Sequence, residues 1–293
     1  MRIVWTWMAA LVALMLLVGC GGGKPRPDRN VVSIGIGEPK SLVPTRANEA
    51  NGSQVLAALF TPLVEYDAGF SPVPLAAESI TTDDNRTWTI RLRPDWTFHD
   101  GEPVTADSYI NAWNAGAYGP NAHDATYFFE KSEGYADLNP PDASTPPAAK
   151  KLRGLERVAD QTFRVTLAEP YVNFKSKLGY TVFYPLPRAA FLDVENNVHD
   201  PGFQEAPIGQ GPFRMHGRWQ HDQLIETRRF EAYAGPVKPK VEGIAFRIYQ
   251  QLTTQYQDLL AGQLDIVPPI PIENIGSAPA DLGDRFRQSP SST

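Results

Sequence analysis

A run of short apolar segments between residues 62 and 98 restricts the fold more than any other feature of this sequence. Residues that form turns separate the segments: Asp67 to Gly69, Pro72, Pro74 and residues 83–85. In the next segment Trp88, Ile90 and Leu92 alternate with polar residues. Alternation with a period of two is typical of a strand with one buried face. The sequence therefore predicts a β-rich block in this part of the chain.

Segments with strand and helix patterns alternate through the rest of the chain. Strand patterns cover residues 31–37, two runs within 155–167, two within 208–230, residues 241–249 and residues 264–267. Helical spacing covers residues 53–60, 106–117 and 253–261, and Gly262 is placed to end the last of these. Residues 171–187 predict a short helix followed by a strand. Strands that alternate with helices favour an α/β fold.

The first twenty residues have the pattern of a processing signal. Residues 3–18 are nearly all apolar but are shorter than the roughly 20 residues that a membrane-spanning helix needs. They lead to Leu17-Val18-Gly19-Cys20, which resembles a bacterial lipobox, and Cys20 is the only cysteine of the chain. We expect a signal peptide at residues 1–19, a lipid on Cys20 and a flexible linker at residues 20–30, so that the folded part stands outside the membrane to which the lipid anchors it.

Composition and motifs argue against several classes of function. The net charge of −6 and the absence of a basic stripe exclude a nucleic-acid partner. None of the five histidines has a second histidine four residues away with a glutamate between them, and a single cysteine cannot form a thiolate cage. No Gly-x-Ser-x-Gly elbow occurs. We therefore expect no catalytic residues, no metal and no cofactor, and hence no enzyme.

The segment WTFHDGEPVTADS at residues 96–108 concentrates polar groups in a way that suggests an acid-base site. Each group also has a structural explanation: Asp100-Gly101 forms a turn, Thr105 caps a helix and Asp107 lies in its first turn. We interpret His99 as structural for the same reason. Gly209 and Gly211 are interpreted as residues that a tight turn requires.

Several segments resemble, in order, the solute-binding proteins of ABC importers of the peptide/nickel class, the oligopeptide- and dipeptide-binding lipoproteins. The most specific segment is residues 72–114, which contain WTIRLRPDWTFHDGEPVTADSYINAWN; EPKSLVP precedes it, and FRVTLAEP, PIGQGPFRM and LLAGQLDIV follow it. The resemblance extends from residue 31 to about residue 267.

This resemblance implies an α/β fold of the periplasmic-binding-protein type, a bilobed clamshell with an additional inserted subdomain. Residues 31–60 and 170–269 would form the first lobe, and residues 61–169 would form the inserted β-rich subdomain. Residues 270–293 would begin the crossover to a second large lobe, which we expect to be missing. Because half a clamshell cannot close, we expect the 293-residue chain to bind oligopeptides weakly or not at all.

The function implied by the resemblance is that of an extracytoplasmic protein that captures oligopeptides for an ABC importer. Its partners would be the peptide and the permease subunits, and the protein would be a monomer. Other solutes remain open as ligands, namely a nickel chelate, a sugar or an opine. A lipoprotein hydrolase and a role without transport, as an adhesin or a chaperone, are more distant alternatives.

The resemblance also suggests which residues contact the ligand. The loop after the first strand lines the cleft in relatives, and aromatic residues of the long excursion are expected at its floor. Residues 267–269 would lie where the chain leaves for the second lobe. The expected ligand contacts are Glu38, Pro39, Lys40, Ser41, Tyr127, Phe128, Val267 and Pro268.

Overall fold

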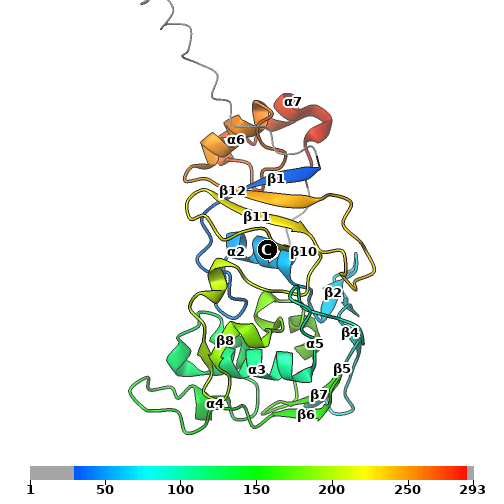
Figure 1. Cartoon of the computed structure of the whole chain (residues 1–293), viewed down its shortest axis with the longest axis vertical. Helices are drawn as coiled ribbons and strands as arrows, with labels where there is room; N and C mark the ends of the chain where they lie inside the picture. The colour runs from blue at the N-terminus through cyan, green and yellow to red at the C-terminus, as the bar shows by residue number, and fades with distance from the viewer. Residues whose placement is uncertain (1–29, 289–293) are drawn as a thin grey trace, which may run out of the picture.

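A computed structural model describes residues 30–288 of the chain, and two four-stranded sheets organise it (Figure 1). The expected signal peptide, the lipid site at Cys20 and nearly all of the linker lie outside the described residues. Within residues 30–288 no helix combines the length and the apolar character that a membrane crossing requires.

The first sheet has the strand order β1-β12-β11-β10. These strands are Val31–Ile36, Gly243–Ile248, Leu224–Arg229 and Phe213–Met215. β1 and β12 are parallel, and the other neighbours are antiparallel. Helix α2 (Ala50–Leu59) lies beside β10, and α6 (Leu252–Leu260) packs on β1, because Gly35 leaves the space that Gln255 occupies.

The second sheet is antiparallel and has the order β4-β5-β7-β6. Its strands are Ala77–Thr81, Thr87–Leu92, Thr162–Thr166 and Leu155–Ala159. Helix α3 (Ala106–Ala117) covers it, with Tyr109 stacked on Phe163 at 5.5 Å between ring centroids. The indole N–H of Trp113 donates to the carbonyl of Phe183 at 3.1 Å. The predicted strands at residues 155–167 and the predicted helix at residues 106–117 are confirmed.

The remaining elements are short. The strands are β2 (Val64–Tyr66), β3 (Pro72–Pro74), β8 (Phe191–Asp193) and β9 (Val198–His199). The helices are α4 (Tyr135–Leu138), α5 (Phe174–Lys177) and α7 (Ala278–Leu282). Single 3-10 turns include η2 (Thr126–Phe129), η3 (Thr181–Phe183) and η4 (Arg188–Ala190).

Two predicted strands are wrong. The one expected within residues 171–187 is absent; η3 lies there instead, and Pro185 and Pro187 have no amide with which to join a ladder. Residues 264–267 form only one isolated bridge, between Ile266 and Ile34, after which come Pro268 and Pro269.

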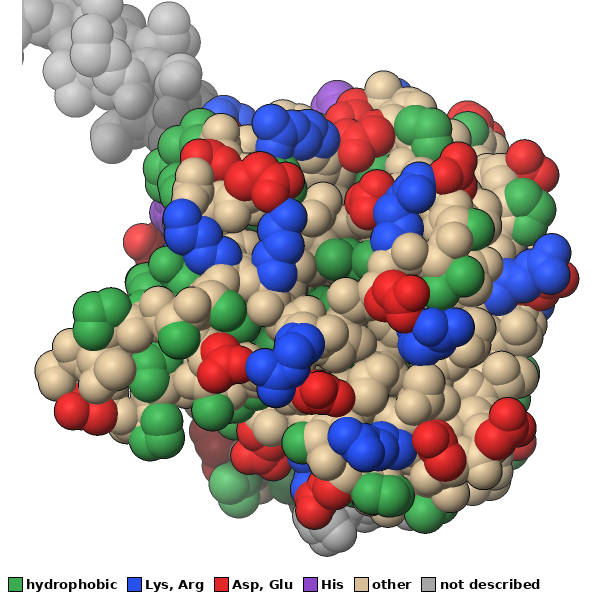
Figure 2. All heavy atoms as spheres, turned by 90° about the horizontal axis from the view of Figure 1, so that it is seen from below, with side chains coloured by type: hydrophobic (Ala, Val, Ile, Leu, Met, Phe, Trp, Pro, Cys, Tyr) green, Lys and Arg blue, Asp and Glu red, His purple; other side chains and the backbone are tan. Residues whose placement is uncertain are grey.

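Acidic and basic side chains are mixed over the lower end of the molecule (Figure 2). Exposed ion pairs account for part of this mixture, for example Lys131 with Glu169 at 2.6 Å and Arg153 with Asp137 at 3.1 Å. Such pairs stabilise a fold only slightly, since water screens them.

His99 joins the segment between β5 and α3 to the loop that precedes β10. Its backbone amide donates to the carbonyl of Gly209 at 2.8 Å, and its Nδ1 accepts from the Gly209 amide at 3.1 Å. Its Nε2 then carries the proton and donates to the carbonyl of Gly211 at 3.2 Å. Burial lowers the pKa of His99 to about 4.

The two glycines of this loop lie against the end of α2. A Cβ atom on Gly209 would be 1.9 Å from the carbonyl oxygen of Leu59, and one on Gly211 would be 2.4 Å from the carbonyl carbon of Leu59. The Gly211 amide donates to the same Leu59 oxygen at 2.8 Å. Close approach of two backbones, rather than a tight turn at positive φ, therefore requires glycine at both positions.

The Gly209→Ala variant should be less stable than the wild type by about 3 kcal/mol or more, because the added methyl group overlaps backbone atoms that cannot move independently. Urea unfolding measures the difference. Gly276→Ala is the matched control, since nothing lies within 4 Å of its Cβ position, and it should stay within about 0.5 kcal/mol of the wild type. Equal losses in the two variants would contradict the packing explanation.

His99 also predicts a dependence of stability on pH. Its pKa is about 4 in the folded chain and about 6.5 in an unfolded one. Between these values the unfolded state takes up the proton first, so acidification from pH 6.5 to pH 4 removes up to about 3 kcal/mol of stability. The free energy of unfolding of His99→Gln should be lower than that of the wild type at pH 7, and the difference between the two should become smaller towards pH 4. A constant difference across that range would show that His99 does not titrate in this way.

Candidate functional site

The loop after β1 is fixed to the amino end of α2. The Gly37 amide donates to Asn51 Oδ1 at 3.0 Å, and the Lys40 amide lies 3.3 Å from Glu49 Oε1, its acceptor. Glu49 is also the N-cap of α2, where its carboxylate accepts from the Asn51 and Gly52 amides, each at 2.7 Å. A carboxylate at this end of a helix is stabilised by the helix dipole. Glu49 therefore sets both the start of α2 and the position of the loop.

A cavity of about 300 Å³ opens beside this helix end. Its walls come from the first turn of α2, from η2 and from η3. The aromatic lining is a cluster of three rings in which Phe128 contacts both Tyr127, at 4.7 Å between ring centroids, and Tyr180, at 5.3 Å, with the rings tilted by 32° and 46°. The side chains of Tyr127 and Tyr180 are each 54% exposed. We call this cavity the aromatic pocket; its lining is Ala47, Asn48, Glu49, Ala50, Ser53, Ala125, Tyr127, Phe128, Tyr180, Thr181 and Val182.

The aromatic pocket contains two of the residues that the sequence suggested, Tyr127 and Phe128. Glu49 and Tyr180 were missed. A glutamate is not among the residues that N-cap statistics favour, and the helix was expected to begin three residues later, at Ser53. For Tyr180 the sequence offers only an aromatic residue in a segment that was expected to be a strand.

Glu38 is occupied by partners from its own chain. Its carboxylate accepts from His221 Nδ1 at 2.8 Å and from the Asp222 amide at 3.0 Å. The other ring nitrogen of His221 lies 3.2 Å from Glu205, and Trp219 packs on the ring at 4.1 Å. Hydrogen bonding to Glu38, with Glu205 adding to it, raises the pKa of His221. Glu38 thus fixes the loop that contains His221.

The neighbours of Glu38 face different surroundings. Pro39 is buried, and so is Ser41, whose hydroxyl accepts from the Val43 amide at 3.1 Å. Lys40 is exposed. None of these four loop residues lines the aromatic pocket; the Lys40 amide links the loop to it through Glu49, which does.

Val267 and Pro268 lie apart from the aromatic pocket. They follow Ile266, whose amide donates to Ser33 O at 3.0 Å and whose carbonyl accepts from the Gly35 amide at 2.9 Å. Val267 lines a separate cavity of about 290 Å³ between the end of α6 and α7. The structure therefore does not bring all of the predicted ligand contacts together.

Metal chemistry has no visible support in the described part of the chain. Within residues 30–288 no group of three or more His, Cys, Asp and Glu side chains could hold a metal ion. His123 and His199 lie 5.0 Å apart between ring centroids, and burial is the main reason that their pKa values fall, to about 3 and about 4. They form a largely buried pair in which His199 belongs to β9.

Comparisons with known proteins agree on one kind of relative. A family model described as Bacterial extracellular solute-binding proteins, family 5 Middle, matches residues 71–293. The oligopeptide-binding protein OppA of Bacillus subtilis is 25% identical over 266 residues, which are 87% of this chain and 47% of that protein. The nickel-binding periplasmic protein of Escherichia coli is 27% identical over 235 residues, which are 79% of this chain and 39% of that protein.

The structural likeness covers the same share of the chain. The crystal structure of Haemophilus influenzae OppA in complex with the peptide RPPGFSPFR matches with a TM-score of 0.75 and 25% identity, over 88% of this chain and 49% of that one. The chain thus spans about half the length of the proteins that it matches. The α/β fold expected from the sequence is that of the corresponding part of periplasmic binding proteins.

Proposed function

This chain belongs to family 5 of the bacterial extracellular solute-binding proteins, and on that premise we propose that it contributes one wall of a peptide-binding cleft that serves an ABC importer. The aromatic pocket is the part of that wall that contacts side chains of the peptide. The permease subunits are the proposed partners, and the protein acts as a monomer without chemical conversion of the ligand.

The exposure of the two tyrosine rings of the aromatic pocket is the main support for this proposal. Two tyrosines, each 54% exposed, lie at the mouth of a cavity rather than in the core. Covering apolar surface with a ligand contributes about 25 cal/mol of favourable free energy for each Å² that is removed from water. Pockets for small ligands are typically lined by aromatic side chains with a few polar groups. In the aromatic pocket the polar groups are Asn48, Glu49 and Ser53.

Peptides suit this lining better than a bare metal ion does. The relatives include proteins named for oligopeptides and for nickel, but the pocket offers aromatic faces and one carboxylate. That carboxylate already accepts from the Asn51, Gly52 and Lys40 amides. Two amides of the loop after β1, those of Gly37 and Lys40, are likewise engaged within the chain. We therefore assign the main contacts to the rings and fewer to the loop backbone than the sequence suggested.

We also propose the division of the chain that the resemblance implies. Residues 31–60 and 170–269 form the first lobe, and residues 61–169 form the inserted subdomain. The sheets support this division, because β1, β10, β11 and β12 fall in the first set of residues and β4 to β7 fall in the second. A second lobe would close over the cleft, and residues 270–293 would lead towards it.

We expect the 293-residue chain to bind peptides weakly, with a dissociation constant on the order of millimolar, because only one wall of the cleft is present. Titration of the chain with tri- to pentapeptides, followed by NMR, should shift the ring resonances of Tyr127 and Tyr180. Tyr127→Ala and Tyr180→Ala should each weaken binding roughly fivefold, since each removes an aromatic contact worth about 1 kcal/mol.

Phe70→Ala is the control for the peptide titration, because Phe70 is 73% exposed in the turn between β2 and β3 and does not line the pocket. If neither tyrosine substitution changed the affinity for peptides, the aromatic pocket would not be part of the binding cleft. Micromolar binding by the 293-residue chain would contradict the need for closure.

Anchoring through Cys20 is a further part of the proposal, supported by the sequence before it. Cells that express the protein with a labelled fatty acid should incorporate the label into the wild type and not into Cys20→Ala. The wild type should fractionate with the membrane, and the variant should not. A label that persists in Cys20→Ala would show that the cysteine is not the acylated residue.

A further inference from the structure

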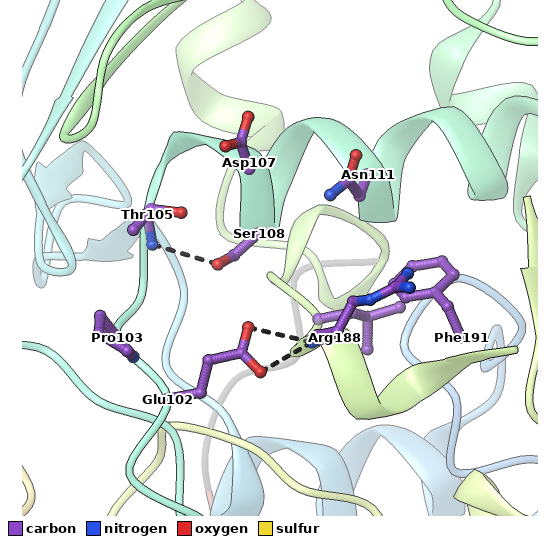
Figure 3. A pocket seen from close by; sticks show the side chains of 9 residues that line it. Glu102, Pro103, Thr105, Asp107, Ser108, Asn111, Arg188 and Phe191 are labelled. Atoms are coloured by element: carbon purple, nitrogen blue, oxygen red, sulfur yellow. Dashed lines mark hydrogen bonds between the residues drawn. The ribbon is translucent and has the colours of Figure 1, made fainter. Parts of the chain in front are cut away.

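Another cavity, of about 330 Å³, lies between the first turns of α3 and residues 186–191 (Figure 3). We call it the charged cavity. It shares no lining residue with the aromatic pocket. Part of the WTFHDGEPVTADS segment forms its rim. This cavity is of interest because charges of opposite sign face it from different segments.

One side of the cavity is acidic. The carboxylate of Glu102 points towards the backbone of Arg188, whose amide donates to both carboxylate oxygens at 3.0 Å (Figure 3). Burial raises the pKa of Glu102. Asp107 adds a second carboxylate from α3, which pairs with Arg157 at 3.2 Å. The backbone bond fixes the Glu102 carboxylate while each oxygen retains a further lone pair.

The other side offers donors without partners. The guanidinium of Arg188 is exposed and makes no hydrogen bond or ion pair with any side chain of residues 30–288; it acts on Glu102 only through space. The side-chain amide of Asn111, on the next turn of α3, likewise makes no hydrogen bond within that range. Leu186, 1% exposed, and Phe191, 8% exposed, form the apolar base of the cavity.

We propose that this cavity binds a small zwitterion, an α-amino acid with an apolar side chain. Its ammonium group would meet Glu102, its carboxylate would meet Arg188 and Asn111, and its side chain would contact Leu186 and Phe191. An arginine recognises a carboxylate through paired N–H donors. A simple anion would be repelled by Glu102 and Asp107, and a simple cation by Arg188, so only a ligand with both charges matches both sides. The proposal does not depend on peptide binding in the aromatic pocket.

The test is an NMR titration of the 293-residue chain with L-leucine. Saturable shifts are expected for residues 102–111 and 186–191. Two analogues each lack one charge: 3-methylbutylamine lacks the carboxylate, and 4-methylpentanoate lacks the ammonium group. Both should bind at least about tenfold more weakly, which corresponds to the loss of one charge-assisted contact.

Two substitutions distinguish leucine binding in this cavity from unspecific binding elsewhere on the protein. Glu102→Gln and Arg188→Gln should each weaken leucine binding about tenfold, whereas Arg91→Gln, which removes an exposed arginine paired with Glu78 on the second sheet, should leave it unchanged. The Arg188 side chain makes no hydrogen bond within residues 30–288, so Arg188→Gln tests the proposal even where Glu102→Gln unfolds. The absence of saturable shifts in the wild type, or equal affinity of the wild type and Arg188→Gln, overturns the proposal.

Discussion

The hydrogen bonds between His99 and the loop of Gly209 and Gly211 are the contact on which the arrangement of the two sheets depends. Residues more than 100 positions apart meet there, backbone to backbone and ring to backbone. The same loop rests on the last residue of α2 with no space for a side chain. Three segments therefore converge at one point: the end of α2, the segment between β5 and α3, and the loop that precedes β10. Only a neutral imidazole can donate at one nitrogen and accept at the other. Burial lowers the pKa of His99 and so keeps its ring in the neutral form that these hydrogen bonds require.

The opposite end of α2 positions the aromatic pocket in a related way. Glu49 accepts from two amides of the helix and lies 3.3 Å from the amide of Lys40 in the loop. The helix is thus fixed at its carboxyl end by the glycine loop and at its amino end by its own cap. Tyr127 and Phe128 then pack beside a helix end that has little freedom to move. A site assembled on such a support keeps its geometry without a ligand, which reduces the entropy that binding must overcome.

Local patterns predicted the elements whose own residues determine them. Helix α3 begins after Thr105, whose amide donates to Ser108 Oγ at 3.1 Å, and it ends where expected. Strands β6 and β7 form where the sequence predicts two strands, and in β7 buried side chains alternate with half-buried ones. The strand expected at residues 264–267 failed because its pairing depends on a distant residue: it is limited to one bridge, between Ile266 and Ile34. Glu49 was missed for a local reason, since it caps α2 through the nearby Asn51 and Gly52 amides although glutamate is not a favoured N-cap residue. Tyr127 and Phe128 came from a family resemblance rather than from a pattern, and Tyr180 could be found only once the chain was folded.

The aromatic pocket and the charged cavity between α3 and residues 186–191 make different demands on a ligand. In the aromatic pocket the exposed faces of Tyr127 and Tyr180 gain free energy from any apolar surface that covers them, so the rings alone select little. Selectivity for a particular solute must then come from whatever completes the cleft. In the charged cavity, by contrast, both Glu102 and Arg188 line the same small volume. Glu102 repels a ligand that is only negatively charged, and Arg188 repels one that is only positively charged. The polar segment that first suggested a catalytic site is therefore better suited to discriminate between charges than to move a proton, because its one histidine is committed to the backbone of the glycine loop.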